Sequence, residues 1–273
     1  MSLVRPFNCA IRSEKRSFTL LARPPHMISF RAVSKSFGEK QVLREVSFDV
    51  QPGEVFFIIG ASGVGKSVLI KHLIGLLRPD SGEIWLEGEE VSQFGEARMY
   101  PVRKKCAMVF QHSTLFDSMT CAENVALPLR KHQALSEKDA LVEAHRLLER
   151  VKMKDFASRF PSELGDGMKK RVAIARALTL SPRYVLFDEP TTSLDPVSAR
   201  RVDQLIRELS DTLGVTSIVV SHDLTSIFSI ADRIVMLYKG KVKLVGTPDD
   251  FRQSADGVIQ QFINGRAEGP MEA

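Results

Sequence analysis

The sequence predicts an α/β fold built around a phosphate-binding loop, and three observations lead to this prediction. The string GASGVGKS at 60–67 stands between a continuous apolar run at 55–59 and an apolar segment of helical length. Two later apolar runs, 183–187 and 215–220, lead directly into polar residues, as strands of doubly wound sheets do at the end that carries their chemistry. Between these regions, residues 136–151 show helical periodicity.

The glycine string predicts a nucleotide site. Its spacing fits G-x-x-x-x-G-K-[ST], in which backbone N–H groups and the positive end of the next helix surround phosphate oxygens. We expect Lys66 to reach the β- and γ-phosphates and the Ser67 hydroxyl to ligate Mg²⁺. A plain turn before a core helix is the structural alternative, but such a turn needs no lysine followed by a hydroxyl. The predicted nucleotide-binding residues of this loop are Gly60, Ala61, Ser62, Gly63, Val64, Gly65, Lys66, Ser67 and Val68.

Apolar and alternating runs on both sides of the loop predict a β-rich lobe at the start of the domain. Turn residues separate these runs, first at Gln51-Pro52-Gly53-Glu54 and then at Arg78-Pro79-Asp80-Ser81-Gly82. The predicted elements are strands at 28–33, 42–50 and 55–59, a helix at 66–77, and strands at 83–88 and 105–110.

The second half begins with an amphipathic helix at 136–151. Ser136 is suited to cap its N-terminus and Asp139 lies in its first turn. No internal repeat is found in the sequence. The remaining predicted elements are strands at 183–187 and 215–220, a hairpin of 233–238 and 241–245 around Lys239-Gly240, and a closing helix over 248–263 that is interrupted near 255–257.

Acidic residues after the strand at 183–187 predict hydrolysis of the nucleotide. We expect Asp188 to bind Mg²⁺ through water and Glu189 to orient or deprotonate the attacking water. His222, also at a strand end, can hydrogen-bond the γ-phosphate or that water. Taken singly, the two acids could be a strand that ends at the surface, and His222 and Gln111 could be ordinary loop residues.

Composition excludes several classes of protein. The chain has 273 residues, of which 44% are hydrophobic, enough for a sizeable core. Its net charge is +5, but five basic residues against Glu14 give residues 1–27 a charge of +4, so the rest is nearly neutral and predicts no nucleic-acid surface. For this basic extension at 1–26 three origins stay open: a start site placed too far upstream, a disordered segment, or a targeting segment.

The cysteines and the hydropathy exclude two further classes. Cys9, Cys106 and Cys121 have no C-x-x-C spacing, so neither a disulfide framework nor a zinc site is indicated and a reducing compartment is expected. No apolar run approaches the roughly 20 residues that span a bilayer. Any membrane role must therefore come through a partner.

Taken in order, these segments resemble the motifs of an ATP-binding cassette (ABC) ATPase over about residues 27–245. The resemblance implies a P-loop NTPase fold, with a RecA-like core, an antiparallel β lobe and a helical subdomain inserted at about 112–180. The domain would span 27–264 and a tail 265–273. The motifs, in chain order, are the glycine loop, Gln111, the signature segment Leu164-Gly165-Asp166-Gly167-Met168, Asp188-Glu189, Ser193-Leu194-Asp195 and His222.

The same resemblance implies roles for residues that the spacing alone does not assign. Phe37 would stack on adenine, although a strand aromatic is about as often part of the core. Gln111 would join Ser67 and Asp188 around Mg²⁺ and couple the site to a membrane partner. Such cassettes form head-to-tail dimers, so a homodimer is implied. In it Ser193 to Asp195 would line the interface, and Gly165, Asp166 and Gly167 would close over the ATP of the other subunit.

A finer resemblance is to the Mla-type ATPases of bacterial phospholipid transport, carried by the stretches 102–130, 229–242 and 258–270. It implies a peripheral protein at the cytoplasmic face of the inner membrane, with an integral-membrane permease docked on 111–130. An MCE-type lipid-binding subunit and a STAS-type accessory subunit on the helical section are implied as further partners. Cassettes for polar amino-acid uptake, lipoprotein release or solvent tolerance share this plan, so another transported substrate stays open. A soluble translation or repair protein is disfavoured, because those carry two cassettes or a coiled-coil insertion.

The signature segment departs from the family's Leu-Ser-Gly-Gly pattern. Gly165 replaces the serine that would bond the partner's γ-phosphate, and Asp166 adds a negative charge where a helix is expected to start. The lost hydrogen bond is worth roughly 1.5–3 kcal/mol, and a carboxylate capping the helix would occupy the end that phosphate uses. Two interpretations stay open: a cassette that binds ATP and barely hydrolyses it, or an outward-turned Asp166 paired with Lys169 or Lys170 in a slow ATPase.

Overall fold

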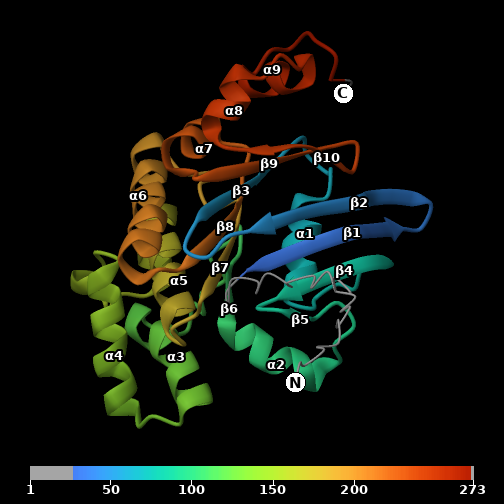
Figure 1. The fold of residues 1–273 in the computed structure, drawn as a ribbon. Coiled ribbons are helices and arrows are strands. Elements are labelled where there is room, and N and C mark those ends of the chain that lie inside the picture. Colours follow the sequence, from blue (N-terminus) through green and yellow to red (C-terminus); the bar gives the residue numbers. More distant parts are fainter. Residues whose placement is uncertain (1–26, 272–273) are drawn as a thin grey trace, which may run out of the picture.

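The computed structural model describes residues 27–271, so the predicted extension at 1–26 lies outside the described residues. Its strands form two sheets (Figure 1). The antiparallel sheet has the order β2 (Lys40–Val50), β1 (Ile28–Phe37), β4 (Ser81–Leu86) and β5 (Glu89–Glu90). The six-stranded sheet has the order β10 (Lys241–Gly246), β9 (Arg233–Tyr238), β3 (Val55–Ile59), β8 (Thr216–Val220), β7 (Tyr184–Asp188) and β6 (Cys106–Val109).

Five of the six strands in the larger sheet run parallel, and β10 pairs with β9 as the predicted hairpin. Because the strands β3, β7 and β8 are neighbours and parallel, their carboxyl ends meet at one edge. The helices that connect and cover the strands are α1 (Lys66–Leu73), α2 (Glu96–Lys105), α3 (Cys121–Gln133), α4 (Glu137–Arg150), α5 (Asp166–Leu178), α6 (Pro196–Leu213), α7 (Leu224–Ile230), α8 (Pro248–Gln253) and α9 (Gly257–Ile263). Two short 3₁₀ turns, Lys154–Phe156 and Pro161–Glu163, link α4 to α5.

Alternation along β3 divides the core into two clusters. Val55, Phe57 and Ile59 face the cluster shared with α3 to α7, whereas Phe56 and Ile58 face the cluster shared with α1 and the antiparallel sheet. All five side chains are fully buried. A strand covered on both faces needs an unbroken apolar run, which is what the sequence at 55–59 supplies.

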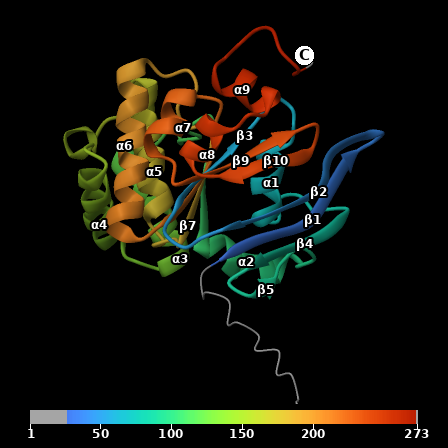
Figure 2. The same ribbon diagram turned by 45° about the horizontal axis from the view of Figure 1, so that its top comes forward.

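The helical section of α3, α4 and α5 lies on one side of the larger sheet and the antiparallel sheet on the other (Figures 1 and 2). This arrangement, with a parallel core, an antiparallel lobe and an inserted helical section, confirms the predicted fold class. No helix within residues 27–271 combines the length and apolarity needed to cross a membrane. Ser136 caps α4 as predicted, accepting a hydrogen bond from the Asp139 N–H.

Several predicted bounds were wrong. The helix expected over 66–77 ends at Leu73, because Gly75 has a φ of 66° and breaks the helical path. Similarly, β1 extends four residues past its predicted end to Phe37. In contrast, the interruption predicted near 255–257 in the closing helix is confirmed, because α8 ends at Gln253 and Asp256 caps α9.

Candidate functional site

The glycine loop connects β3 to α1 at the edge where the parallel strands end. Gly60 has a φ of 140°, and a Cβ there would lie 2.3 Å from the Leu237 carbonyl oxygen. Gly65 has a φ of 110°, and its Cβ would meet the Leu43 side chain at 2.6 Å. Glycine is therefore required at both positions by the protein's own packing and backbone conformation. Ala61, Ser62 and Gly63 are exposed at the tip of the loop.

The Lys66 side chain folds back over this loop. Its Nζ donates to the carbonyl oxygens of Gly60 at 2.9 Å and Ala61 at 3.1 Å, and only 7% of the residue is exposed. Burial lowers the pKa of Lys66 from its usual value, while the nearby Glu189 and Asp188 carboxylates raise it. The ammonium is thus held next to the exposed tip, where it can meet an anion.

Three strand ends bring the predicted hydrolytic residues together. The Ser67 hydroxyl donates to Asp188 Oδ1 at 2.7 Å. Glu189 Oε2 accepts a hydrogen bond from the Thr192 hydroxyl at 3.1 Å and lies 2.8 Å from Nδ1 of His222. The four predicted residues therefore form two contacting pairs, Ser67 with Asp188 and Glu189 with His222, which the peptide bond between 188 and 189 joins.

Glu189 occupies a strained backbone position. Its φ is 50°, which non-glycine residues rarely adopt, and its N–H donates to the Val220 carbonyl at 2.9 Å. Strain of this kind persists where the surrounding structure holds it, and it is common at functional sites. Here it aims the carboxylate at the end of β8, where His222 stands.

The set fits a nucleotide-bound Mg²⁺. Ser67 and Asp188 supply hard oxygen donors 2.7 Å apart, and Mg²⁺ takes one or two such protein ligands together with phosphates and water. Within residues 27–271 no group of three His, Cys, Asp or Glu side chains could hold a metal ion by itself. The arrangement therefore suits a metal that arrives with a phosphate ligand.

Two predicted binding residues lie apart from this set. The Gln111 side chain is exposed just after β6, and in the described part of the chain no hydrogen bond joins it to Ser67 or Asp188. Phe37, at the end of β1, is 47% exposed, with Lys35 Nζ 5.6 Å from the ring centroid. The alternative that Phe37 belongs to the core is therefore wrong.

The signature segment opens α5, and Gly165 rather than Asp166 is its N-cap. The expectation of an Asp166 cap was wrong, because Asp166 is the first residue inside the helix. Its side chain is 70% exposed, and Oδ1 lies 3.5 Å from Lys169 Nζ, which confirms the outward-turned interpretation. Lys170 does not share this pairing, since its Nζ donates to two backbone carbonyls. A Cβ at Gly165 would meet nothing within 4 Å.

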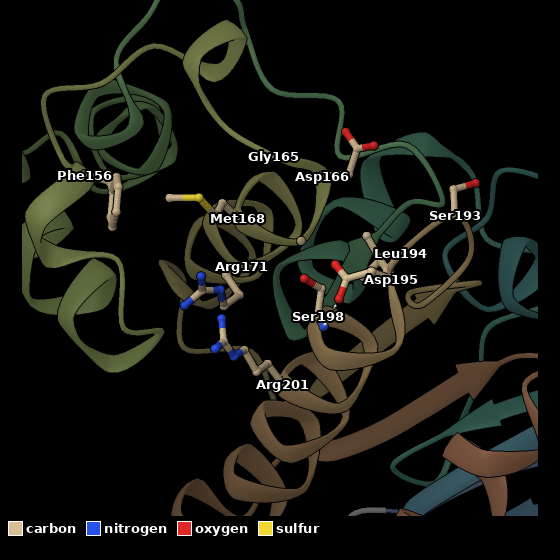
Figure 3. A pocket seen from close by; sticks show the side chains of 11 residues that line it. Phe156, Gly165, Asp166, Met168, Arg171, Ser193, Leu194, Asp195, Ser198 and Arg201 are labelled. Carbon is tan, nitrogen blue, oxygen red and sulfur yellow. Dashed lines mark hydrogen bonds between the residues drawn. The ribbon is translucent and has the colours of Figure 1, made fainter.

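A cavity of about 480 Å³ lies between the starts of α5 and α6 (Figure 3). There a Cβ at Gly167 would lie 2.8 Å from Ser198, so the two helix ends approach closely. Arg171 and Arg201 point toward one another on one side of this cavity, and Met168 and Phe156 lie beside them. The segment 193–195 borders the cavity, with Asp195 capping α6.

A charged cluster that was not predicted from the sequence holds Asp223, the residue after His222, in place. Arg200 of α6 donates to Asp223 Oδ2 at 2.6 Å and to the Ser226 hydroxyl at 3.1 Å. Its other terminal nitrogen lies 2.7 Å from Asp203 Oδ2, in poor alignment for a hydrogen bond. Asp223 in turn caps α7. An i,i+3 Arg–Asp pair on the helix was the signal that could have found it.

This cluster predicts a stability change between about pH 4 and pH 6. Burial raises the pKa of Asp203 to about 6, although Arg200 lowers it. The folded state then keeps a proton that the unfolded chain releases, so the free energy of unfolding falls by up to about 3 kcal/mol as pH rises through this window. In the Asp203→Asn variant, the free energy of unfolding measured by urea titration should no longer fall between pH 4.5 and pH 7. An equal fall in the wild type and in the variant would contradict this prediction.

Comparison with known proteins decides the family. The profile described as ABC transporter matches residues 43–192. The chain belongs to the ABC transporter family. This ABC cassette is 37% identical over 246 residues to the intermembrane phospholipid transport system ATP-binding protein MlaF of Escherichia coli (strain K12), covering 90% of this chain and 91% of that one. It is therefore an ATPase, as the loop and the two acids predicted.

Two further relatives extend the comparison. Protein TRIGALACTOSYLDIACYLGLYCEROL 3, chloroplastic, of Arabidopsis thaliana is 37% identical over 262 residues, covering 90% of the cassette and 75% of the relative. A solved dimer of an ATP-binding cassette in a post-hydrolysis state, bound to ADP and Pi, matches with a TM-score of 0.74 and 30% identity. That match covers 81% of this chain and 98% of the solved one.

Proposed function

We propose that this cassette is the ATP-hydrolysing subunit of a phospholipid transporter. The observation that carries the proposal is the 37% identity to a phospholipid transport ATP-binding protein, which extends over 90% of the chain and is not confined to the nucleotide motifs. The assembly would contain two copies of the chain, an integral-membrane permease and an MCE-type lipid-binding subunit. The chain would lie peripherally at the cytoplasmic face of the inner membrane.

Within this function the site residues have separate roles. Lys66 binds the phosphates, with the backbone N–H groups of residues 60–65 around it. Ser67 and Asp188 would hold Mg²⁺, which when bound would neutralise developing phosphate charge. Glu189 orients the attacking water and accepts its proton, and His222, 2.8 Å away, keeps that carboxylate in place.

A groove in the helical section suits the permease. It lies within and beside the segment 111–130, and its volume is about 250 Å³. Met119, Ala126, Leu127 and Leu141 give it an apolar lining, and Glu123, Arg130 and Glu137 stand around them. An apolar groove with charges beside it fits an amphipathic helix of a partner. The STAS-type subunit would bind where Arg150, Lys152 and Arg171 of the same section line a second cavity together with Arg201 of α6.

Co-purification tests the proposal. The chain co-expressed with its neighbouring permease should remain bound to it in detergent, and Leu127→Glu in the groove should release it. The matched variant Val142→Glu, on the exposed face of α4, should leave the complex intact. Binding to ribosomes or DNA in place of a membrane protein would contradict the proposal.

The altered signature favours a second candidate, a cassette that binds ATP and hydrolyses it very slowly. We expect Asp166→Gly to change turnover by less than about three-fold, because this carboxylate is exposed and paired with Lys169. Gly165→Ser should lower the ATP concentration for half-maximal turnover about ten-fold. The serine hydroxyl would gain one hydrogen bond to a charged phosphate oxygen, and such a bond accounts for about that factor. Steady-state kinetics of the assembled complex test both. A more than ten-fold faster Asp166→Gly variant would favour the regulatory cassette.

A further inference from the structure

Helix α5 holds the segment that contains Gln111 by its backbone. Lys170 Nζ donates to the carbonyl oxygens of Phe110 at 3.0 Å and Gln111 at 2.6 Å. Only 2% of Lys170 is exposed, in contrast to Lys169 one residue earlier, which pairs with Asp166 at the surface. A buried ammonium with two carbonyl acceptors is a specific and costly arrangement.

A second cation of the same helix extends this contact. Arg176 donates to the Thr114 carbonyl at 3.0 Å, to the Ser113 carbonyl at 3.3 Å and to the Thr114 hydroxyl at 3.1 Å. Together Lys170 and Arg176 bind the backbone carbonyls of residues 110, 111, 113 and 114. The segment is therefore fixed to α5, whose first residue belongs to the signature segment.

We propose that Lys170 is a positioning residue, which ties the backbone of Gln111 to the helix of the signature segment so that movement of the helical section carries the Gln111 side chain with it. The proposal rests on the proposed function and on the role that the resemblance to ABC ATPases implies for Gln111, which would join the Mg²⁺ site and couple it to the permease. The Gln111 side chain is exposed and free of described contacts with the glycine loop, so its backbone contacts decide where it lies.

The location of Lys170 supports this role over a purely local one. It lines the same cavity of about 450 Å³ as Gln111 and Thr192, the residue whose hydroxyl bonds Glu189. Burial lowers the pKa of Lys170 to about 8, although the Asp166 and Asp188 carboxylates raise it. The ammonium thus lies between the signature segment and the acids at the end of β7.

The test uses a double-mutant cycle in the complex of the full chain with its permease. Lys170→Met removes the donors and keeps the stem, and Lys170→Arg keeps a buried cation. We expect Lys170→Met to lower kcat about ten-fold, to change KM for ATP less than two-fold and to raise the Mg²⁺ concentration for half-maximal turnover. Lys170→Arg should restore at least half of kcat. Lys154→Met, on the exposed surface of the helical section, is the matched control and should match wild type.

Combination with Gln111→Ala decides whether Lys170 acts through Gln111. The double variant should turn over within two-fold of Gln111→Ala alone. A full multiplicative loss in the double variant, or no loss in Lys170→Met, would overturn the proposal. If Lys170→Met does not fold, Lys170→Leu, which also carries no donor, takes its place in the cycle with the same expected result. Full turnover of Gln111→Ala would instead show that the role proposed for Gln111 itself is wrong, whatever Lys170 does.

Discussion

Glu189→Gln is expected to reduce ATP turnover at least about 100-fold while ATP affinity changes less than about three-fold. The amide keeps the size of the side chain and its contact with the Thr192 hydroxyl, but it cannot accept a proton from water, a contribution typically worth 10²- to 10⁴-fold. Phosphate release and binding of a fluorescent ATP analogue measure the two effects separately.

The control for this variant is Glu143→Gln, on the outer face of α4, where the carboxylate pairs only with Arg146 in the described structure. It should match wild type in both assays. Turnover of Glu189→Gln above a tenth of wild type would contradict the role of Glu189 as the base. Loss of ATP binding in that variant would instead show that Glu189 contributes to ATP binding.

Lys66→Met should weaken ATP binding about 100-fold or more. The methionine keeps the apolar stem that is buried beside the loop but removes the ammonium that Glu189 and Asp188 favour in its charged form. Two charged hydrogen bonds to phosphate, at roughly 1.5 kcal/mol each, account for an effect of this size. Isothermal titration with ATP and Mg²⁺ measures it.

Lys71→Met, five residues further along α1, provides the comparison for the lysine variant. Lys71 lies in the last turn of the helix, away from the loop. The Lys71→Met variant should bind ATP with an affinity within about two-fold of wild type, since an exposed or half-exposed charge at that distance is screened. Equal ATP affinity of Lys66→Met and Lys71→Met would contradict the phosphate site.

Strands were predictable where burial on both faces forces a continuous apolar run. The strands at 55–59 and 233–238 were predicted at their observed bounds for this reason. Helix α2 was not predicted, because EARMYPVRKK contains Pro101 and buries only Met99 and Val102, which leaves almost no apolar periodicity to recognise. Helix α6 was also missed, although Asp195 followed by Pro196 is a helix-start signal that could have revealed it.

The candidate site likewise has residues that the sequence could predict and contacts that it could not. Residues that belong to local motifs, such as Lys66, Asp188 and His222, could be predicted as site residues because the motif and the strand end locate them without a fold. The contacts of Lys170 with Phe110 and Gln111 join segments about sixty residues apart in the chain. No spacing rule reaches that far, so Lys170 was predicted only as a partner of Asp166.

The most direct test of the proposed function is phosphate release by the chain co-expressed with its permease and MCE-type subunit in lipid nanodiscs. We expect ATP turnover that depends on the permease, and movement of labelled phospholipid that stops in the Glu189→Gln variant. ATP binding without turnover in the complete assembly, in wild type and variant alike, would contradict a transport motor and leave a nucleotide-binding regulatory cassette.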